Sequence, residues 1–244
     1  MTNDYFWEII ISGALPGCQN MALDEAAFQM LIDGKLTKPL LRFYTWSKPC
    51  LTIGYFQKYA DFAGGSFPVI RRLTGGLAVN HCNDISYSLV ISEKYLPSIR
   101  DQQKTYMTIH SALRAGLEKA GIKTDYCPQN GDKHTNLCTA SIFAHDLAIC
   151  GKKILGSCQR RRGNVLLQQG SIQVAIPKRQ TPEQFARTIS QGFAKALGIT
   201  LSQTTISDGQ IALAKELSFS KYRSLDWNLH HCATKPHRVI TKIR

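Results

Sequence analysis

The stretch with the clearest chemical potential is Arg71–His81, which reads RRLTGGLAVNH. Its two arginines supply fixed cationic groups, and Thr74-Gly75-Gly76 forms a turn that can adopt positive φ and let a ligand approach the main chain. The apolar residues on both sides are typical of strands. The stretch therefore combines an anion-handling loop with buried strands. A Gly-Gly pair is also typical of a hairpin turn, and by residue type alone that interpretation stays open.

A reactive thiol beside a lysine is a second possibility. A nucleophilic thiolate needs a cationic neighbour and partial exposure. Cys150 and Cys158 fall within predicted strands, which favours a core position for both. Cys138 instead ends a polar loop, just before a strand that turns back into Lys153, so a thiol and an ammonium group could meet. By composition alone Lys153 is an ordinary exposed turn lysine.

Composition restricts the partners. Thirty Lys plus Arg against seventeen Asp plus Glu give a formal charge of +13, which attracts anionic molecules. No recognition helix, aromatic stacking platform or dense basic arm is evident, so we expect no nucleic-acid binding. Small acidic carrier proteins are also partners that this positive charge would attract.

The eight cysteines contain no CxxC pair, so they are expected to be reduced thiols, and most of them buried. His230, His231, Cys232 and His237 match no structural zinc spacing, and we expect no metal.

Chain length and hydropathy predict one domain. A chain of 244 residues can bury one sizeable core, and no repeat or low-complexity linker divides it. Its apolar runs are too short for a transmembrane helix, and the N-terminal MTNDYFWEII lacks the basic region of a signal peptide. We expect a cytoplasmic monomer that does not bind membranes.

Hydrophobic periodicity predicts helices packed on a sheet, an α+β fold. The Ser47-Lys48-Pro49 turn suggests that strands 40–46 and 50–54 form a hairpin, and residues 145–176 read as an antiparallel meander. The other expected elements are strands at 5–11 and 85–91, and helices at 20–33, at 104–120, from the Thr181 capping box to Gly198, and from Ser207.

Several of these segments together resemble the biotin/lipoate protein ligase superfamily. RRLTGGLAVNH followed by DISYS is similar to the superfamily signature, and its Tyr-Ser ending is closer to the octanoyltransferase branch than to the ATP-using ligases. Residues 20–25, 42–46 and 53–57 resemble the first blocks, and GKKILGSCQR at 151–160 resembles the lysine block. The resemblance implies a ligase-like catalytic domain over residues 1–228, with a mixed, mostly antiparallel sheet flanked by helices, and a basic tail over 229–244.

The resemblance also implies a site and a reaction. Cys138 corresponds to an acyl-accepting nucleophile and Lys153 to the lysine that contacts the acyl carbonyl. The implied substrate-binding residues are Arg72, Thr74, Gly75, Gly76, His81, Gly156 and Ser157. An octanoyl or lipoyl group would pass from acyl carrier protein to Cys138 and then to a lysine of a lipoyl-accepting domain, such as the glycine cleavage H protein or a 2-oxoacid dehydrogenase E2, without a cofactor.

Two alternatives remain. A lipoate–protein ligase would use ATP and Mg²⁺, but Leu77 stands where ligases usually carry a third glycine, Cys82 replaces a common aspartate, and the chain after Trp227 is short for an accessory domain. A non-catalytic binding protein for acyl carriers or lipoyl domains is the second, encouraged by Gln169 in place of the usual histidine. Thr139 departs too, since an aromatic residue usually follows the cysteine.

Overall fold

The computed structural model describes residues 5–127 and 145–231. Eight strands form the main sheet, in the order β11-β1-β2-β6-β10-β9-β8-β7, and three form a small sheet, β4-β3-β5. The strands are β1 (Phe6–Leu15), β2 (Leu40–Trp46), β3 (Cys50–Ile53), β4 (Val69–Arg71), β5 (Val79–His81), β6 (Ile85–Ser92), β7 (Asp125–Tyr126), β8 (Leu147–Ile149), β9 (Lys152–Arg162), β10 (Val165–Ile172) and β11 (Thr200–Gln203). The expected α+β fold with a mostly antiparallel sheet is confirmed.

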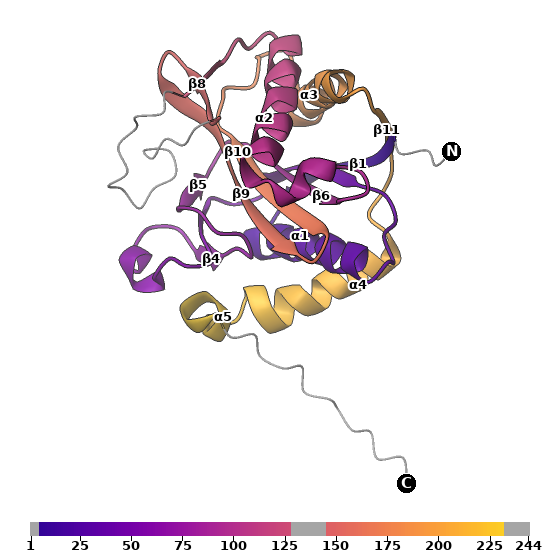
Figure 1. Ribbon diagram of the computed structural model, residues 1–244. Helices are drawn as coiled ribbons and strands as arrows, with labels where there is room; N and C mark the ends of the chain where they lie inside the picture. The colour runs from indigo at the N-terminus through magenta and orange to yellow at the C-terminus, as the bar shows by residue number, and fades with distance from the viewer. Residues whose placement is uncertain (1–4, 128–144, 232–244) are drawn as a thin grey trace.

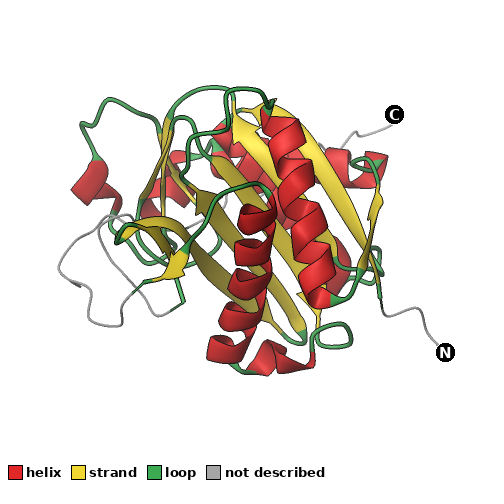
Figure 2. Ribbon diagram, turned by 90° about the horizontal axis from the view of Figure 1, so that it is seen from above, coloured by secondary structure: helices red, strands yellow, loops and turns green. Residues whose placement is uncertain are grey.

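Helices cover both faces of the main sheet (Figures 1 and 2). They are α1 (Gly17–Ile32), α2 (Gln102–Lys119), α3 (Pro182–Leu197), α4 (Asp208–Leu217) and α5 (Leu225–His230), with a π-helical turn at Ser218–Tyr222 after α4. Helices α2 and α3 pack side by side on one face, and α1 and α4 on the other. Among the described residues, no helix has the length and apolar character needed to cross a bilayer.

Strand alternation decides which side chains reach which face. In β6, Tyr87 and Leu89 join the core beneath α2 and α3, while Ser86 and Ser88 point to the opposite side, toward α1. The same central strand thus contributes apolar side chains to one face and hydroxyls to the other. This arrangement places a polar site on the α1 side of the sheet.

The expected helix after residue 180 is confirmed. Thr181 accepts a hydrogen bond from the main chain of Gln184, and the Gln184 side chain accepts one from the main chain of Thr181. Proline occupies the first turn, and Gly198 ends the helix in the left-handed conformation, with φ of 65°. The predicted antiparallel meander is also confirmed, although β10 ends at Ile172.

Two expectations were wrong. Strands β2 and β3 do not form a hairpin, because β2 pairs with β1 and β6 while β3 pairs with β4 and β5. Helix α1 begins at Gly17, and not at Asn20 as expected. A Cβ at position 17 would collide with Ile70, so the first residue of the helix has to be glycine. A start at Asn20 would put Asp24 and Glu25 in the first turn of the helix, but in the structure they lie in its middle and are buried.

Candidate functional site

Lys153 lies at the start of β9, and a buried carboxylate holds its ammonium group in place. Its Nζ lies 2.7 Å from Asp146 Oδ2, and the two side chains are 4% and 1% exposed. The side chain folds along its own strand, since a Cβ at Gly156 would lie 2.6 Å from Lys153 Cε and 2.8 Å from Nζ. Glycine at 156 is therefore required by the lysine itself. Lys153 is a fixed buried cation and not the ordinary turn lysine that composition suggests.

Arg72 supports the glycine turn from inside. Its guanidinium donates hydrogen bonds to the main-chain oxygens of Gly75 and Leu77, each at 2.7 Å, and to Thr52. Gly76 has φ of 81°, and a Cβ there would overlap Cys158 Sγ. Gly76 thus lets the turn bend and approach β9 closely. It is not a hairpin between β4 and β5, because both strands pair with β3.

Arg71 has a purely internal role. It is fully buried and donates to the main-chain oxygens of Gly54, Tyr55 and Gln57, and to that of Asn228 in α5. Burial lowers the pKa of its guanidinium. These bonds occupy the cation with carbonyl groups, so Arg71 ties residues 54–57 to α5.

His81 is oriented by a buried aspartate. Its Nδ1 lies 2.8 Å from Asp84 Oδ2, its Nε2 lies 2.8 Å from Thr52 Oγ1, and its ring stacks on Trp46 at 3.8 Å. Asp84 also accepts hydrogen bonds from Ser86 and Ser171. Although burial raises the pKa of Asp84, His81 and the two hydroxyl groups outweigh it and hold that pKa below its usual value. His81 therefore presents one fixed face to the site.

These residues surround a narrow cavity of about 30 Å³. Its wall contains Met21, Tyr44, Trp46, Thr52, Arg72, Val79, His81, Ser86, Gly156, Ser157, Cys158, Gln169, Gly170 and Ser171. A second cavity, of about 20 Å³, is lined by Lys153 and shares Val79, Gly156 and Ser171 with the first. Of the expected substrate-binding residues, Arg72, His81, Gly156 and Ser157 line the first cavity, while Thr74, Gly75 and Gly76 form the turn beside Arg72.

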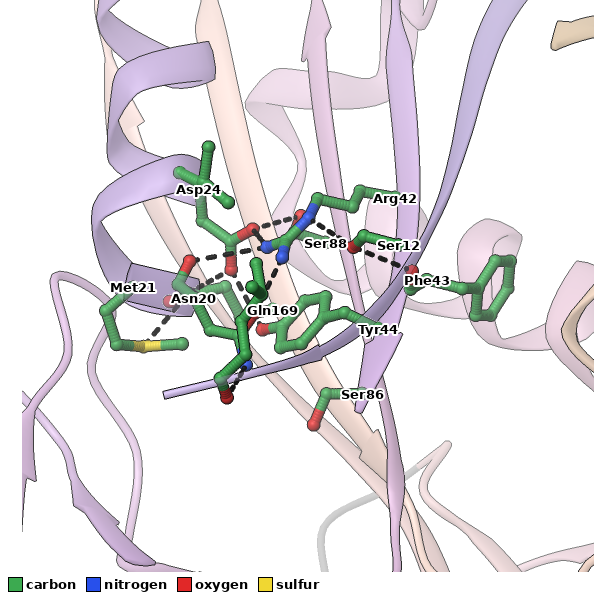
Figure 3. A network of polar contacts seen from close by, with 12 residues as sticks. Ser12, Asn20, Met21, Asp24, Arg42, Phe43, Tyr44, Ser86, Ser88 and Gln169 are labelled. Carbon is green, nitrogen blue, oxygen red and sulfur yellow. Dashed lines mark hydrogen bonds and ion pairs between the residues drawn. The ribbon is translucent and has the colours of Figure 1, made fainter. Parts of the chain in front are cut away.

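Behind the cavity lies a polar network centred on Asp24 (Figure 3). The carboxylate accepts hydrogen bonds from four side chains, those of Arg42, Tyr44, Ser88 and Gln169, at 2.6 to 2.9 Å. The network joins α1 to β2, β6 and β10. Because each partner satisfies the buried charge, the network fixes the relative positions of the elements that bear the site.

Gln169 links this network to the glycine turn. Its amide nitrogen donates to Asp24 at 2.8 Å, and its amide oxygen accepts from Thr74 Oγ1 at 2.9 Å. An amide offers a donor and an acceptor side by side, as a neutral imidazole does. Gln169 can therefore make the contacts expected of a histidine at this position.

The cysteines take different positions. Cys138 lies outside the described residues. Cys150 was expected in the core, but it is exposed in a turn with φ of 48°, so that expectation was wrong. Cys158 is half-buried in the cavity wall, 3.6 Å from Arg72. Burial raises the pKa of the Cys127 thiol, and the charge of Asp146 adds to this, so the site disfavours a thiolate.

Sequence reasoning missed Asp146 and His110. Asp146 stands among apolar residues in FAHDLAI, and an acid in such a run signals a buried partner. His110 is on the apolar face of α2 and is fully buried, with Nδ1 2.6 Å from the His145 carbonyl oxygen and Nε2 2.7 Å from Ser157 Oγ. Its helical spacing with apolar residues predicts burial but indicates no partner.

Comparisons with known proteins agree with this architecture. The model of the lipoyl protein ligase A/B catalytic domain matches residues 16–199. Octanoyltransferase LipM from Clostridioides difficile is 37% identical over 212 residues, covering 79% of this chain and 78% of the relative. LipM from Brevibacillus brevis is 29% identical over 272 residues, covering 91% and 98%.

Solved structures give the same fold. A bi-partite lipoate protein ligase from Thermoplasma acidophilum superposes with a TM-score of 0.70 at 21% identity, covering 94% of this chain and 98% of the other. A lipoate-protein ligase A bound with ATP gives 0.72 at 24% identity, covering 91% and 98%. At these identities the likeness supports the fold alone.

Proposed function

The chain belongs to the lipoyl protein ligase A/B catalytic domain family, and we propose that it is an octanoyltransferase of lipoate biosynthesis. The donor is an octanoyl thioester on acyl carrier protein. Cys138 carries the acyl group in between, and the acceptor is a lysine of a lipoyl-accepting domain, in a glycine cleavage H protein or a 2-oxoacid dehydrogenase E2.

The reaction has two acyl-transfer steps. First, the Cys138 thiolate attacks the donor carbonyl carbon and the carrier leaves as a thiol after protonation, which gives an acyl-enzyme. Second, the neutral amine of the acceptor lysine attacks the new thioester, Cys138 leaves, and the amine proton is lost as the amide forms. A thioester is already activated, so neither step needs ATP or a metal ion.

The observation that supports this reaction best is the buried ammonium group of Lys153. Asp146 and Gly156 fix it beside the cavity wall. A fixed cation in a site of low dielectric stabilises both a thiolate and the oxyanion that develops on the acyl carbonyl. Preorganised groups of this kind act in the transition state without the cost of reorientation.

The cavity wall suits an acyl tail, but the cavity must widen before the tail can enter. Met21, Trp46 and Val79 give the wall apolar surface. Burial of methylene groups contributes about 0.8 kcal/mol each, so an octanoyl tail can supply several kcal/mol to fix its carbonyl. A space of about 30 Å³ corresponds to a single water molecule, so side chains in the wall move when the tail binds.

The net charge suits both partners. Acyl carrier proteins and lipoyl domains are acidic, and a formal charge of +13 attracts them over a Debye length of about 8 Å at physiological salt. The same positive charge therefore attracts the donor protein first and the acceptor protein afterwards. Association is therefore expected to slow as salt increases.

Intact-mass spectrometry tests the proposal. The purified protein is incubated with octanoyl-acyl carrier protein without ATP, and we expect one added octanoyl group, removed by hydroxylamine and absent in Cys138→Ala. Cys150→Ala is the matched control, because this thiol is exposed in a turn and is expected to leave the adduct intact.

The two alternatives give other results. A lipoate–protein ligase would need free acid, ATP and Mg²⁺, and would tolerate Cys138→Ala. A binding protein would show neither an adduct nor transfer to an acceptor domain. Either result would overturn the thioester route.

A further inference from the structure

His110 is a buried histidine that the proposed reaction does not use. It lies on α2, fully enclosed, and both ring nitrogens have close partners. A carbonyl oxygen can only accept, so Nδ1 must carry the proton that is donated to His145. When the ring is neutral, Nε2 is therefore the acceptor and receives the hydroxyl proton of Ser157. The contact with His145 thus fixes which neutral tautomer His110 adopts.

A directed chain of hydrogen bonds leads to this histidine. Arg161, which can only donate, binds the amide oxygen of Gln159, and the Gln159 amide nitrogen donates to Gln168 Oε1, both at 2.6 Å. Gln168 Nε2 then donates to Tyr87 Oη at 2.7 Å, and Tyr87 Oη lies 2.6 Å from Ser157 Oγ. Because Tyr87 Oη already accepts from Gln168, we assign its own proton to the bond with Ser157.

Both ends of this chain of hydrogen bonds set its direction. Arg161, at one end, can only donate, and the carbonyl oxygen of His145, at the other end, can only accept. Only a neutral His110 with a proton on Nδ1 satisfies every member.

The two contacts of His110 flank the Asp146–Lys153 pair along the chain. His145 directly precedes Asp146, and its backbone has φ of 75°, which is unfavourable for a residue with a side chain. Ser157 directly follows Gly156, the residue against which Lys153 folds. His110 therefore joins the segment that bears the carboxylate to the strand that bears the lysine.

We propose that His110 is a positioning residue for Lys153, which holds the carboxylate of Asp146 in register with the lysine by bridging His145 and Ser157. It touches no reacting atom. The inference rests on the proposed function for its consequence in catalysis, but the geometry it describes is independent of the reaction.

Three variants test the bridge in the full-length protein. His110→Phe keeps a ring but removes both contacts, His110→Gln restores a donor and an acceptor, and Leu113→Ala weakens the same buried face of α2 without touching the bridge. We expect His110→Phe to lower the single-turnover acylation rate at least about tenfold with the donor KM within about twofold. His110→Gln should return to within about threefold of wild type.

A second readout does not depend on turnover. Competitive acetylation with acetic anhydride compares Lys153 with its exposed neighbour Lys152, by fragment-ion mass spectrometry of the same peptide. The Lys153 to Lys152 labelling ratio should be low in wild type, rise at least about fivefold in His110→Phe, and stay low in His110→Gln. Leu113→Ala, compared in mild urea at equal fraction folded, should leave the ratio low.

The outcomes separate the two proposals. If wild type forms no acyl-enzyme, the proposed function fails and the labelling ratio alone decides on the bridge. If His110→Phe acylates and labels like wild type, or if Leu113→Ala matches its effects, the positioning role is wrong. Should His110→Phe not fold, Ser157→Ala removes one end of the bridge and must give the same two changes, in smaller measure.

Discussion

Replacing His110 by glutamine should remove one step from the pH dependence of stability. Burial, opposed by the bond to the His145 carbonyl and reinforced by the charge of Lys153, lowers the pKa of His110 from 6.5 to about 3. The unfolded chain therefore takes up a proton near pH 6.5 that the folded chain refuses. The neutral histidine contributes stability above pH 6.5, and that contribution is lost as the pH falls toward 3.

The magnitude follows from this shift. One pKa unit corresponds to about 1.4 kcal/mol, so between pH 7 and pH 5 the folded protein should lose about 2 kcal/mol through His110 alone. Glutamine does not titrate and keeps both hydrogen bonds, so His110→Gln should lack this loss. Other groups, Asp84 among them, titrate alike in both proteins, and their contributions cancel in the difference.

Urea denaturation followed by tryptophan fluorescence measures this difference. Free energies of unfolding at pH 7, 6 and 5 should give a wild-type curve that falls about 2 kcal/mol further than the His110→Gln curve. Parallel curves would mean that His110 can be protonated in the folded protein. The directed hydrogen-bond chain would then be wrong.

Three further predictions concern the supporting residues. Gly156→Ala should lower kcat about 100-fold by displacing Lys153, while Gly209→Ala, at an open helical position, should leave kcat unchanged; steady-state kinetics compares them. Asp24→Asn should cost about 3 kcal/mol in urea denaturation because it leaves Arg42 buried beside a neutral group, whereas Glu93→Gln, at a surface pair, should cost less than about 0.5 kcal/mol. Gln169→His should keep kcat within about threefold of wild type, and Gln169→Leu, which removes one of the four donors to the buried Asp24 and leaves Thr74 Oγ1 without its acceptor, should lower both activity and melting temperature.

Local signals in the sequence predicted most elements. The Thr181 capping box and Gly198 bounded α3 because their hydrogen bonds lie within a few residues. The lysine block predicted that Lys153, Gly156 and Ser157 act together, and in the structure their side chains and backbones meet at the cavities.

Long-range pairing could not be predicted in the same way. The turn after Trp46 is typical of a hairpin, but the chain leaves the main sheet there, and β3 finds its partners among residues 69–71 and 79–81. Asp24 and Glu25 resemble the acids of a helix N-terminus, yet each is buried against a distant cation, Arg42 or Lys221. Opposite charges that meet across a fold leave no periodic trace in the sequence.

Arg71 has a consequence for how the protein is made. Four carbonyl groups bind its guanidinium, and the last of them belongs to Asn228, 157 residues further along the chain. A nascent chain exposes the arginine long before that acceptor has been synthesised, and until then water must solvate the charge. Arg71 can therefore join residues 54–57 to α5 only after translation has reached α5, long after Arg71 itself has been made.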